Sequence, residues 1–125
     1  MDGTLKQLYG ISYIVSDFPR AQRFYGETLG LPQLGPDIEG WAEYGDMNGA
    51  HLAIMPWPGP GPMPSKEGGG IAIFSVDDAF KAVAELRKRG VRCDDVIPVP
   101  GMVTWANFYD PDGNRLQVAG PPPAS

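Results

Sequence analysis

One pattern of residues occurs twice in this chain, and the repeat limits the possible folds more than any other feature. The segment Val15-Ser16-Asp17 returns as Val76-Asp77-Asp78, 61 positions later, and Gly30-Leu31 returns as Gly90-Val91, 60 positions later. Because the chain has 125 residues, each copy takes up about half of it. A fold built from two similar modules in tandem is therefore expected.

Each copy begins with a predicted strand that leads into a predicted helix. Residues 9–15 and 71–76 are rich in β-branched and aromatic side chains, which favours a strand. Apolar residues then follow at helical spacing up to the glycine of the shared pattern, which can end a helix. Asp17 is a candidate N-cap for the first helix, and either Asp77 or Asp78 for the second. The first helix should run for about three turns.

Three short apolar stretches follow each helix, and they are predicted to be strands. Glycine, proline, aspartate and asparagine separate them, as is typical of turns. The stretches are 31–34, 41–44 and 51–55 in the first copy, and 91–96, 103–109 and 115–118 in the second. Each copy is therefore predicted to be a βαβββ module.

Proline and glycine dominate residues 56–70 between the copies, so this segment is predicted to be a linker. The first module then covers 6–55 and the second 71–119, within one domain of residues 1–125. A small sheet with one helix leaves one face uncovered, so the modules should pair into a cupped mixed sheet with the helices outside, an α+β fold. The linker is either a plain spacer or a rim that carries Trp57 to the binding site.

Charge and cysteine content restrict the partners and the compartment. A formal net charge of -5 disfavours nucleic acid, which proteins approach with clustered Lys and Arg. The single cysteine, Cys93, cannot form a disulfide within the chain, and no segment has the pattern of a signal peptide or a membrane span. We therefore expect a cytoplasmic protein without membrane association. The neighbouring Asp94 and Asp95 disfavour a thiolate, so Cys93 is predicted to be unreactive.

Several motifs in this order resemble the vicinal oxygen chelate superfamily, which is also called the glyoxalase/bleomycin resistance protein/dioxygenase superfamily. They are the βαβββ repeat, Ile14-Val15-Ser16-Asp17, Phe24-Tyr25, Leu29-Gly30-Leu31, and the Phe-Tyr-Asp-Pro-Asp-Gly-Asn run at 108–114. The superfamily includes glyoxalase I, extradiol dioxygenases and bleomycin-binding proteins. The resemblance covers nearly the whole chain and supports the fold more than any one activity.

In the metal enzymes that this chain resembles, each module supplies a His from its first strand and a Glu from its last strand. The matching positions here hold Gly10 and Ala53 in the first module, and Ile71 and Gln117 in the second. The first three side chains have no donor atom, and the amide oxygen of Gln117 is a weak neutral ligand. The sequence also contains a single histidine, His51. We therefore predict no metal ligands of this kind and no cofactor.

Alternation along the strands predicts which side chains face into the cup. The predicted surface is mostly apolar with a few polar groups, as is typical of a small-molecule site, although each aromatic residue could simply be packed in the sheet. Together with the linker tryptophan, the predicted ligand-binding residues are Ser12, Trp41, Glu43, His51, Trp57, Trp105, Asn107 and Gln117.

The leading hypothesis is a metal-independent binding protein that sequesters an aromatic or cationic compound such as an antibiotic. The resemblance to the bleomycin-binding branch implies a homodimer. The alternative is an enzyme of the lyase, isomerase or dioxygenase-like type. It would use either a non-standard metal site around Glu43, His51 and Gln117, or His51 as a general base that Glu43 orients across the turn. A regulatory domain whose cup binds an effector is the third possibility.

Overall fold

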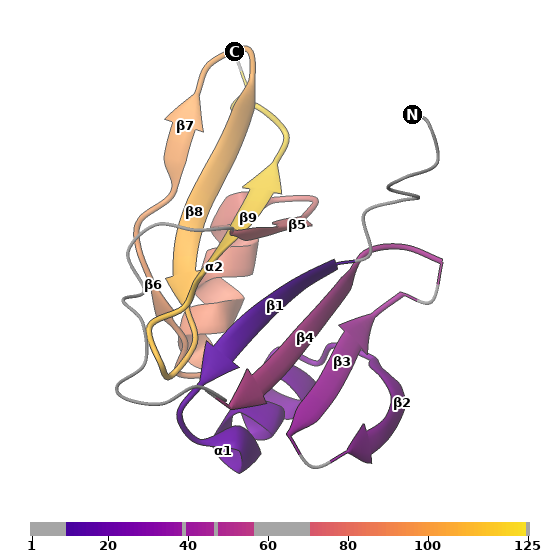
Figure 1. Ribbon diagram of the computed structural model, residues 1–125. Coiled ribbons are helices and arrows are strands. Elements are labelled where there is room, and N and C mark those ends of the chain that lie inside the picture. The colour runs from indigo at the N-terminus through magenta and orange to yellow at the C-terminus, as the bar shows by residue number, and fades with distance from the viewer. Residues whose placement is uncertain (1–9, 39, 47, 57–70, 125) are drawn as a thin grey trace. The chain divides into compact units, whose positions relative to one another are not determined.

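Two mixed sheets, each with helical segments on one face, make up the described part of this protein (Figure 1). The computed structural model describes residues 10–38, 40–46, 48–56 and 71–124. The chain divides into two units, 1–61 and 62–125. The division falls inside the segment predicted as a linker, of which residues 57–70, including Trp57, lie outside the described residues. No helix within the described ranges is long and apolar enough to cross a membrane.

The first module has the predicted order of elements. It consists of β1 (Gly10–Val15), α1 (Phe18–Gln22), a π-helical segment η1 (Arg23–Thr28), β2 (Gln33–Ile38), β3 (Trp41–Gly45) and β4 (His51–Pro56). The sheet order is β1-β4-β3-β2. β1 pairs with β4 in parallel, and the other neighbours pair antiparallel. The first and last strands of the module are therefore direct neighbours.

The second module repeats this topology. It consists of β5 (Ala72–Ser75), α2 (Ala79–Lys88), β6 (Arg92–Cys93), β7 (Ile97–Val99), β8 (Val103–Tyr109) and β9 (Arg115–Gly120). The sheet order is β5-β9-β8-β6, with β7 also paired to β8 and β5 parallel to β9. The α+β class and the two-module order predicted from the repeat are thus confirmed.

Two sequence predictions of local structure were wrong in detail. The predicted strand over 91–96 is broken, because Asp94 and Asp95, which have low strand propensity, separate β6 from β7. The first helix does not continue as an α-helix for three turns, because it widens into η1, where the Leu29 amide donates to the Phe24 carbonyl oxygen at 2.8 Å. This wider turn brings the consecutive residues Phe24 and Tyr25 into the core together.

The core of the first module lies between its helical segments and one face of its sheet. Tyr25 is fully buried, with its ring centroid 6.5 Å from that of Tyr13 and 6.1 Å from that of Tyr44. Alternate residues of the strands supply the rest, including Val15 and Ile54. The opposite face of the sheet carries no helix of this module, and the predicted ligand-binding residues of this module, Ser12, Trp41, Glu43 and His51, lie there.

The second module is built in the same way around α2. Asp78 caps this helix, because its Oδ1 accepts a hydrogen bond from the Lys81 backbone N–H at 3.1 Å. Residues of β8 and β9 alternate between buried positions, such as Phe108 and Leu116, and half-buried positions, such as Gln117. The alternation that the sequence predicted is therefore present in both modules, and each sheet has one helix-free face.

Candidate functional site

Three residues on the helix-free face of the first module form one hydrogen-bonded cluster, the Trp41–Glu43–His51 cluster. The indole Nε1 of Trp41 donates to Glu43 Oε1 at 2.8 Å. The Nδ1 of His51 lies 3.0 Å from Glu43 Oε2. The side chains of His51 and Glu43 are 11% and 17% exposed, so water does not fully screen the contact. Both carboxylate oxygens of Glu43 are engaged by neighbours on its own sheet.

The register of β3 and β4 explains how these residues meet. Glu43 pairs directly with Ala53, and His51 pairs directly with Gly45. His51 therefore reaches Glu43 along the diagonal of the antiparallel pair, which long side chains can span. The sequence predicted Glu43 opposite His51 across the turn, and the two do meet, although diagonally.

The chemistry of the cluster follows from the hydrogen-bonding capacity of each group. A carboxylate only accepts hydrogen bonds, so Glu43 selects the imidazole form of His51 that carries a hydrogen on Nδ1. In the neutral imidazole the lone pair is then on Nε2. The cluster thus combines an aromatic surface, a negative charge and an oriented imidazole, which suits binding of a cation or general base chemistry.

A second polar network lies on the helix-free face of the second module. Gln117 Nε2 donates to Asn107 Oδ1 at 2.9 Å, and Asn107 Nδ2 donates to Asp94 Oδ2 at 3.4 Å. The hydroxyl of Tyr109 donates to the same Asp94 oxygen at 2.6 Å. This hydrogen bond raises the pKa of the Tyr109 phenol, because loss of the proton would place two negative charges together.

Asn107 and Gln117 were predicted from the sequence, but Asp94, which accepts from Asn107, and Tyr109, which donates to Asp94, were not. Alternation could have found Asp94, because Cys93 pairs with the buried Phe108 and the next residue must point to the other face. The loop position of Asp94 after a two-residue strand hid this pattern.

Two other predicted residues have simpler surroundings. Trp105 is half-buried on the same face as Asn107, and its indole makes no hydrogen bond or ring contact with any residue that the structure describes. Ser12 is exposed in β1, where it pairs with Ala53, so a whole strand separates it from Glu43. The structure therefore groups Trp41, Glu43 and His51, and separately Asn107 and Gln117, but leaves Ser12 apart.

The metal positions implied by the family resemblance do not fit a divalent cation here. A Cβ atom on Gly10 would lie 2.2 Å from the backbone oxygen of His51, so the strand pair has no room for a ligating side chain there. Ala53 is buried and has no donor atom, and Gln117 uses its amide nitrogen to bind Asn107. Across the described ranges, no three His, Cys, Asp or Glu side chains are grouped to hold a metal.

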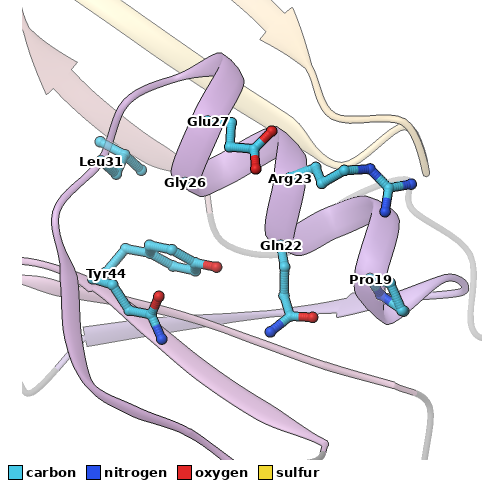
Figure 2. Close-up of a pocket in the computed structure, with 8 residues that line it drawn as sticks. Pro19, Gln22, Arg23, Gly26, Glu27, Leu31 and Tyr44 are labelled. Atoms are coloured by element: carbon cyan, nitrogen blue, oxygen red, sulfur yellow. The ribbon is translucent and has the colours of Figure 1, made fainter.

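A separate open hollow lies on the helical side of the first module. Its volume is about 450 Å³, and its lining includes Gln22, Arg23, Glu27, Leu31, Gln33 and Tyr44. Figure 2 shows Gln22 and the Tyr44 ring between the helical segments and the sheet. None of the predicted ligand-binding residues lines this hollow.

Cys93 precedes Asp94 in the chain but pairs with the buried Phe108, on the opposite face of the sheet from the polar network. Burial is the main cause that raises the pKa of its thiol, and Asp94 adds to the rise while Arg87 opposes it. The thiol donates weakly to the Val91 carbonyl oxygen at 3.6 Å. These contacts favour the protonated, poorly nucleophilic form.

The two βαβββ modules, each with polar residues on the helix-free face of its sheet, define the class of protein. Comparison with known families identifies this class. Residues 8–118 match the model of the glyoxalase/bleomycin resistance protein/dioxygenase superfamily. The chain therefore belongs to this superfamily, as its motifs predicted.

Individual relatives are similar over nearly the whole chain. The uncharacterized protein YaeR of Escherichia coli K12 is 31% identical, covering 91% of this chain and 95% of its own length. A glyoxalase/bleomycin resistance protein from Streptomyces sp. CB03234 is 31% identical with a TM-score of 0.69, covering 90% of this chain and 98% of its own. TnmS3, an antibiotic binding protein from the same Streptomyces, is 30% identical with a TM-score of 0.75, covering 94% and 98%.

Proposed function

We propose that this protein binds a small, partly aromatic and cationic molecule, such as an antibiotic, without a metal ion. The Trp41–Glu43–His51 cluster is the observation that carries the proposal. It offers an indole surface and a carboxylate on a sheet face that has no helix of its own module. A cation lying on an aromatic ring beside a carboxylate is a recurrent mode of recognition. The similarity to TnmS3, an antibiotic binding protein, supports the same ligand class.

Tryptophan fluorescence gives a direct test of this binding. Titration with a panel of aromatic cationic compounds and antibiotics should quench the emission of the wild-type protein. Trp41→Phe should remove most of the change caused by a ligand of the Trp41–Glu43–His51 cluster. A panel that leaves both the fluorescence and the thermal unfolding midpoint unchanged would contradict the proposal.

The local effect of Glu43 on ligand affinity can be separated from the effect of the protein's net charge. Glu43→Gln should weaken a cationic ligand about tenfold or more, because a hydrogen bond to a charged group contributes about 1.5–3 kcal/mol. Glu85→Gln is the matched control, since it removes the same charge from a half-exposed helix residue that pairs with Arg89. Equal losses in the two variants would show that only the net charge matters.

The alternative function is an enzyme that uses His51 as a general base, and the 3.0 Å contact with Glu43 favours it specifically. The base would remove a proton bound to carbon in the ligand. Nuclear magnetic resonance in heavy water would then show exchange of that proton, and His51→Gln would abolish the exchange. Exchange at the same rate in the variant would remove this candidate. A metal-dependent enzyme is the other form of this alternative, and elemental analysis of chelator-free protein tests it.

We also propose that the protein is a homodimer, because the bleomycin-binding branch that its sequence resembles is dimeric. Sedimentation analysis at several concentrations should give twice the mass of one chain. A monomer at all concentrations would contradict this part of the proposal.

A further inference from the structure

Four residues form a transverse row across the second sheet, on the face without α2. Ile73 of β5 pairs with Gln117 of β9, which pairs with Asn107 of β8. The backbone N–H of Asp94 donates to the Asn107 carbonyl oxygen at 2.9 Å, so Asp94 continues the row at the far side. The row thus runs from an apolar end at Ile73, a residue that is 62% exposed, to an acidic end at Asp94.

The acidic end sets the direction of every hydrogen bond in this row. A carboxylate can only accept, so Asn107 must turn its Nδ2 toward Asp94, at 3.4 Å. Its Oδ1 then faces Gln117 and accepts from Nε2 at 2.9 Å. Asp94 is itself held by its backbone bond to β8 and by the Tyr109 hydroxyl at 2.6 Å.

One acceptor remains at the end of this series. With its Nε2 bound to Asn107, the amide of Gln117 must direct Oε1 the other way, toward the Ile73 side of the row. Oε1 has no hydrogen-bond partner among the residues that the structure describes. The neighbouring Trp105 adds an apolar ring on the same face. A carbonyl oxygen on a sheet face that also carries the apolar side chains of Ile73 and Trp105 favours a ligand group that pairs a hydrogen-bond donor with an apolar part.

We propose that Asp94 is a positioning residue that acts through Asn107 to hold Gln117 Oε1 as an acceptor, so that the second module selects ligands carrying an amine or amide N–H next to an aromatic group. This inference rests on the proposed small-molecule binding and adds the chemistry that selects the ligand. Asp94 does not touch the ligand. It affects ligand selectivity by orienting the side-chain amides of Asn107 and Gln117.

The positioning can be measured without any ligand, from the side-chain amide signals of Asn107 and Gln117 in nuclear magnetic resonance spectra. Asp94→Ala should shift both signals and speed the exchange of the Gln117 amide hydrogens with water. Asp94→Asn, which keeps an acceptor oxygen, should restore most of the wild-type spectrum. Asp95→Ala is the matched control, because Asp95 is 95% exposed and pairs with Arg87 instead. Unchanged amide signals in Asp94→Ala would overturn the positioning role.

The ligand preference is tested with two probes that differ only at the nitrogen atom. N-benzylacetamide has an N–H group, and N-benzyl-N-methylacetamide has none. The wild-type protein and Asp95→Ala should bind the first about fivefold more tightly, as expected for one neutral hydrogen bond. Asp94→Ala and Gln117→Leu should bring this ratio close to one.

The possible failures of this test lead to different conclusions. Equal affinity of the two probes for the wild-type protein would overturn the N–H preference and leave small-molecule binding intact. The absence of binding by either probe would overturn the ligand class stated here, and the antibiotic panel would decide independently whether the proposed function stands. A ratio that survives Asp94→Ala would overturn the positioning role alone.

Discussion

At the scale of single residues, the hydrogen bonds of Glu43 hold the candidate site of the first module together. Glu43 accepts from the indole of Trp41 and lies 3.0 Å from the imidazole of His51. Removing one member of such a half-buried cluster leaves the other groups without a partner, which costs more than the loss of an exposed contact.

Glu43 should also contribute to the stability of the fold. Glu43→Ala should lower the free energy of unfolding by about 1–3 kcal/mol, because the Trp41 N–H and the His51 Nδ1 lose their acceptor. Urea unfolding followed by circular dichroism measures this loss. Glu85→Ala, at a half-exposed position, should change stability by less than about 0.5 kcal/mol. Similar losses in both variants would show that the Trp41–Glu43–His51 cluster does not stabilise the fold.

A second prediction at this scale concerns the pH dependence of Cys93. Burial raises the pKa of its thiol, so iodoacetamide should modify it with a pH midpoint above that of the urea-unfolded chain. The raised pKa of the thiol also determines how the free energy of unfolding changes with pH. The neutral thiol contributes stability below the unfolded pKa, and this contribution is lost as pH rises through the folded pKa. Cys93→Ser removes the reaction, and a native midpoint at or below the unfolded one would contradict the assigned environment.

At the scale of secondary structure elements, strand pairing and helix ends explain why some sequence predictions were accurate. Alternation of buried and half-buried residues holds along β3 and β8, so the face of each predicted site residue on these strands followed from its position. The N-cap of α2 was open between Asp77 and Asp78, and the structure assigns it to Asp78. The widening at η1 was not predicted, because helical spacing of apolar residues does not distinguish a π-helical turn from an α-helical one. The gap between β6 and β7 was also missed, although the adjacent Asp94 and Asp95 have low strand propensity.

The cap assignment predicts a difference between two adjacent aspartates. Asp78→Ala should lower the free energy of unfolding by about 1 kcal/mol, because the Lys81 backbone N–H loses its acceptor. Asp77→Ala removes the same charge one position earlier, at an exposed residue, and should have little effect. Chemical denaturation of both variants measures the difference, and a larger loss in Asp77→Ala would contradict the assignment.

The close approach of β1 and β4 leads to another prediction at this scale. Gly10→Ala should destabilise the protein by about 1–3 kcal/mol, because the new Cβ would lie 2.2 Å from the His51 backbone oxygen and the strands must move apart. Gly26→Ala is the matched control, because its Cβ would meet only the Tyr44 ring, at an ordinary 3.5 Å. Thermal unfolding compares the two variants, and a Gly10→Ala protein as stable as the wild type would show that the strand pair has room for a side chain.

At the scale of the whole molecule, the repeat explains why both modules carry their polar groups in equivalent places. Glu43 pairs with Ala53 on the strand beside β1, and Asn107 pairs with Gln117 on the strand beside β5. Ala53 and Gln117 occupy two positions where the metal enzymes of the family carry a ligand, according to the sequence resemblance. Each module therefore has the topology of the metal enzymes. At these positions, however, the first module has a side chain without a metal-ligating atom, and the second has only an amide.

Because these positions lack good metal-ligating atoms, the stability of the protein should not depend on a metal ion. Treatment with a chelator should leave the thermal unfolding midpoint unchanged, because a metal that binds only the folded state would raise it. Elemental analysis of protein purified without a chelator should give less than one divalent ion per chain. One ion per chain, together with a lower midpoint after chelation, would contradict the metal-independent proposal.

The two-module order, the strand faces and the absence of metal-ligating atoms at Gly10, Ala53 and Ile71 could be read from the amino-acid sequence, because they depend on residue type and local periodicity. The diagonal contact between His51 and Glu43, and the hydrogen bonds that join Asp94 to Asn107 and Asn107 to Gln117, became visible in the folded structure. These contacts depend on strand register and on a loop that leaves the sheet after β6. Both are fixed by pairing between residues far apart in the chain, and local pattern does not encode them.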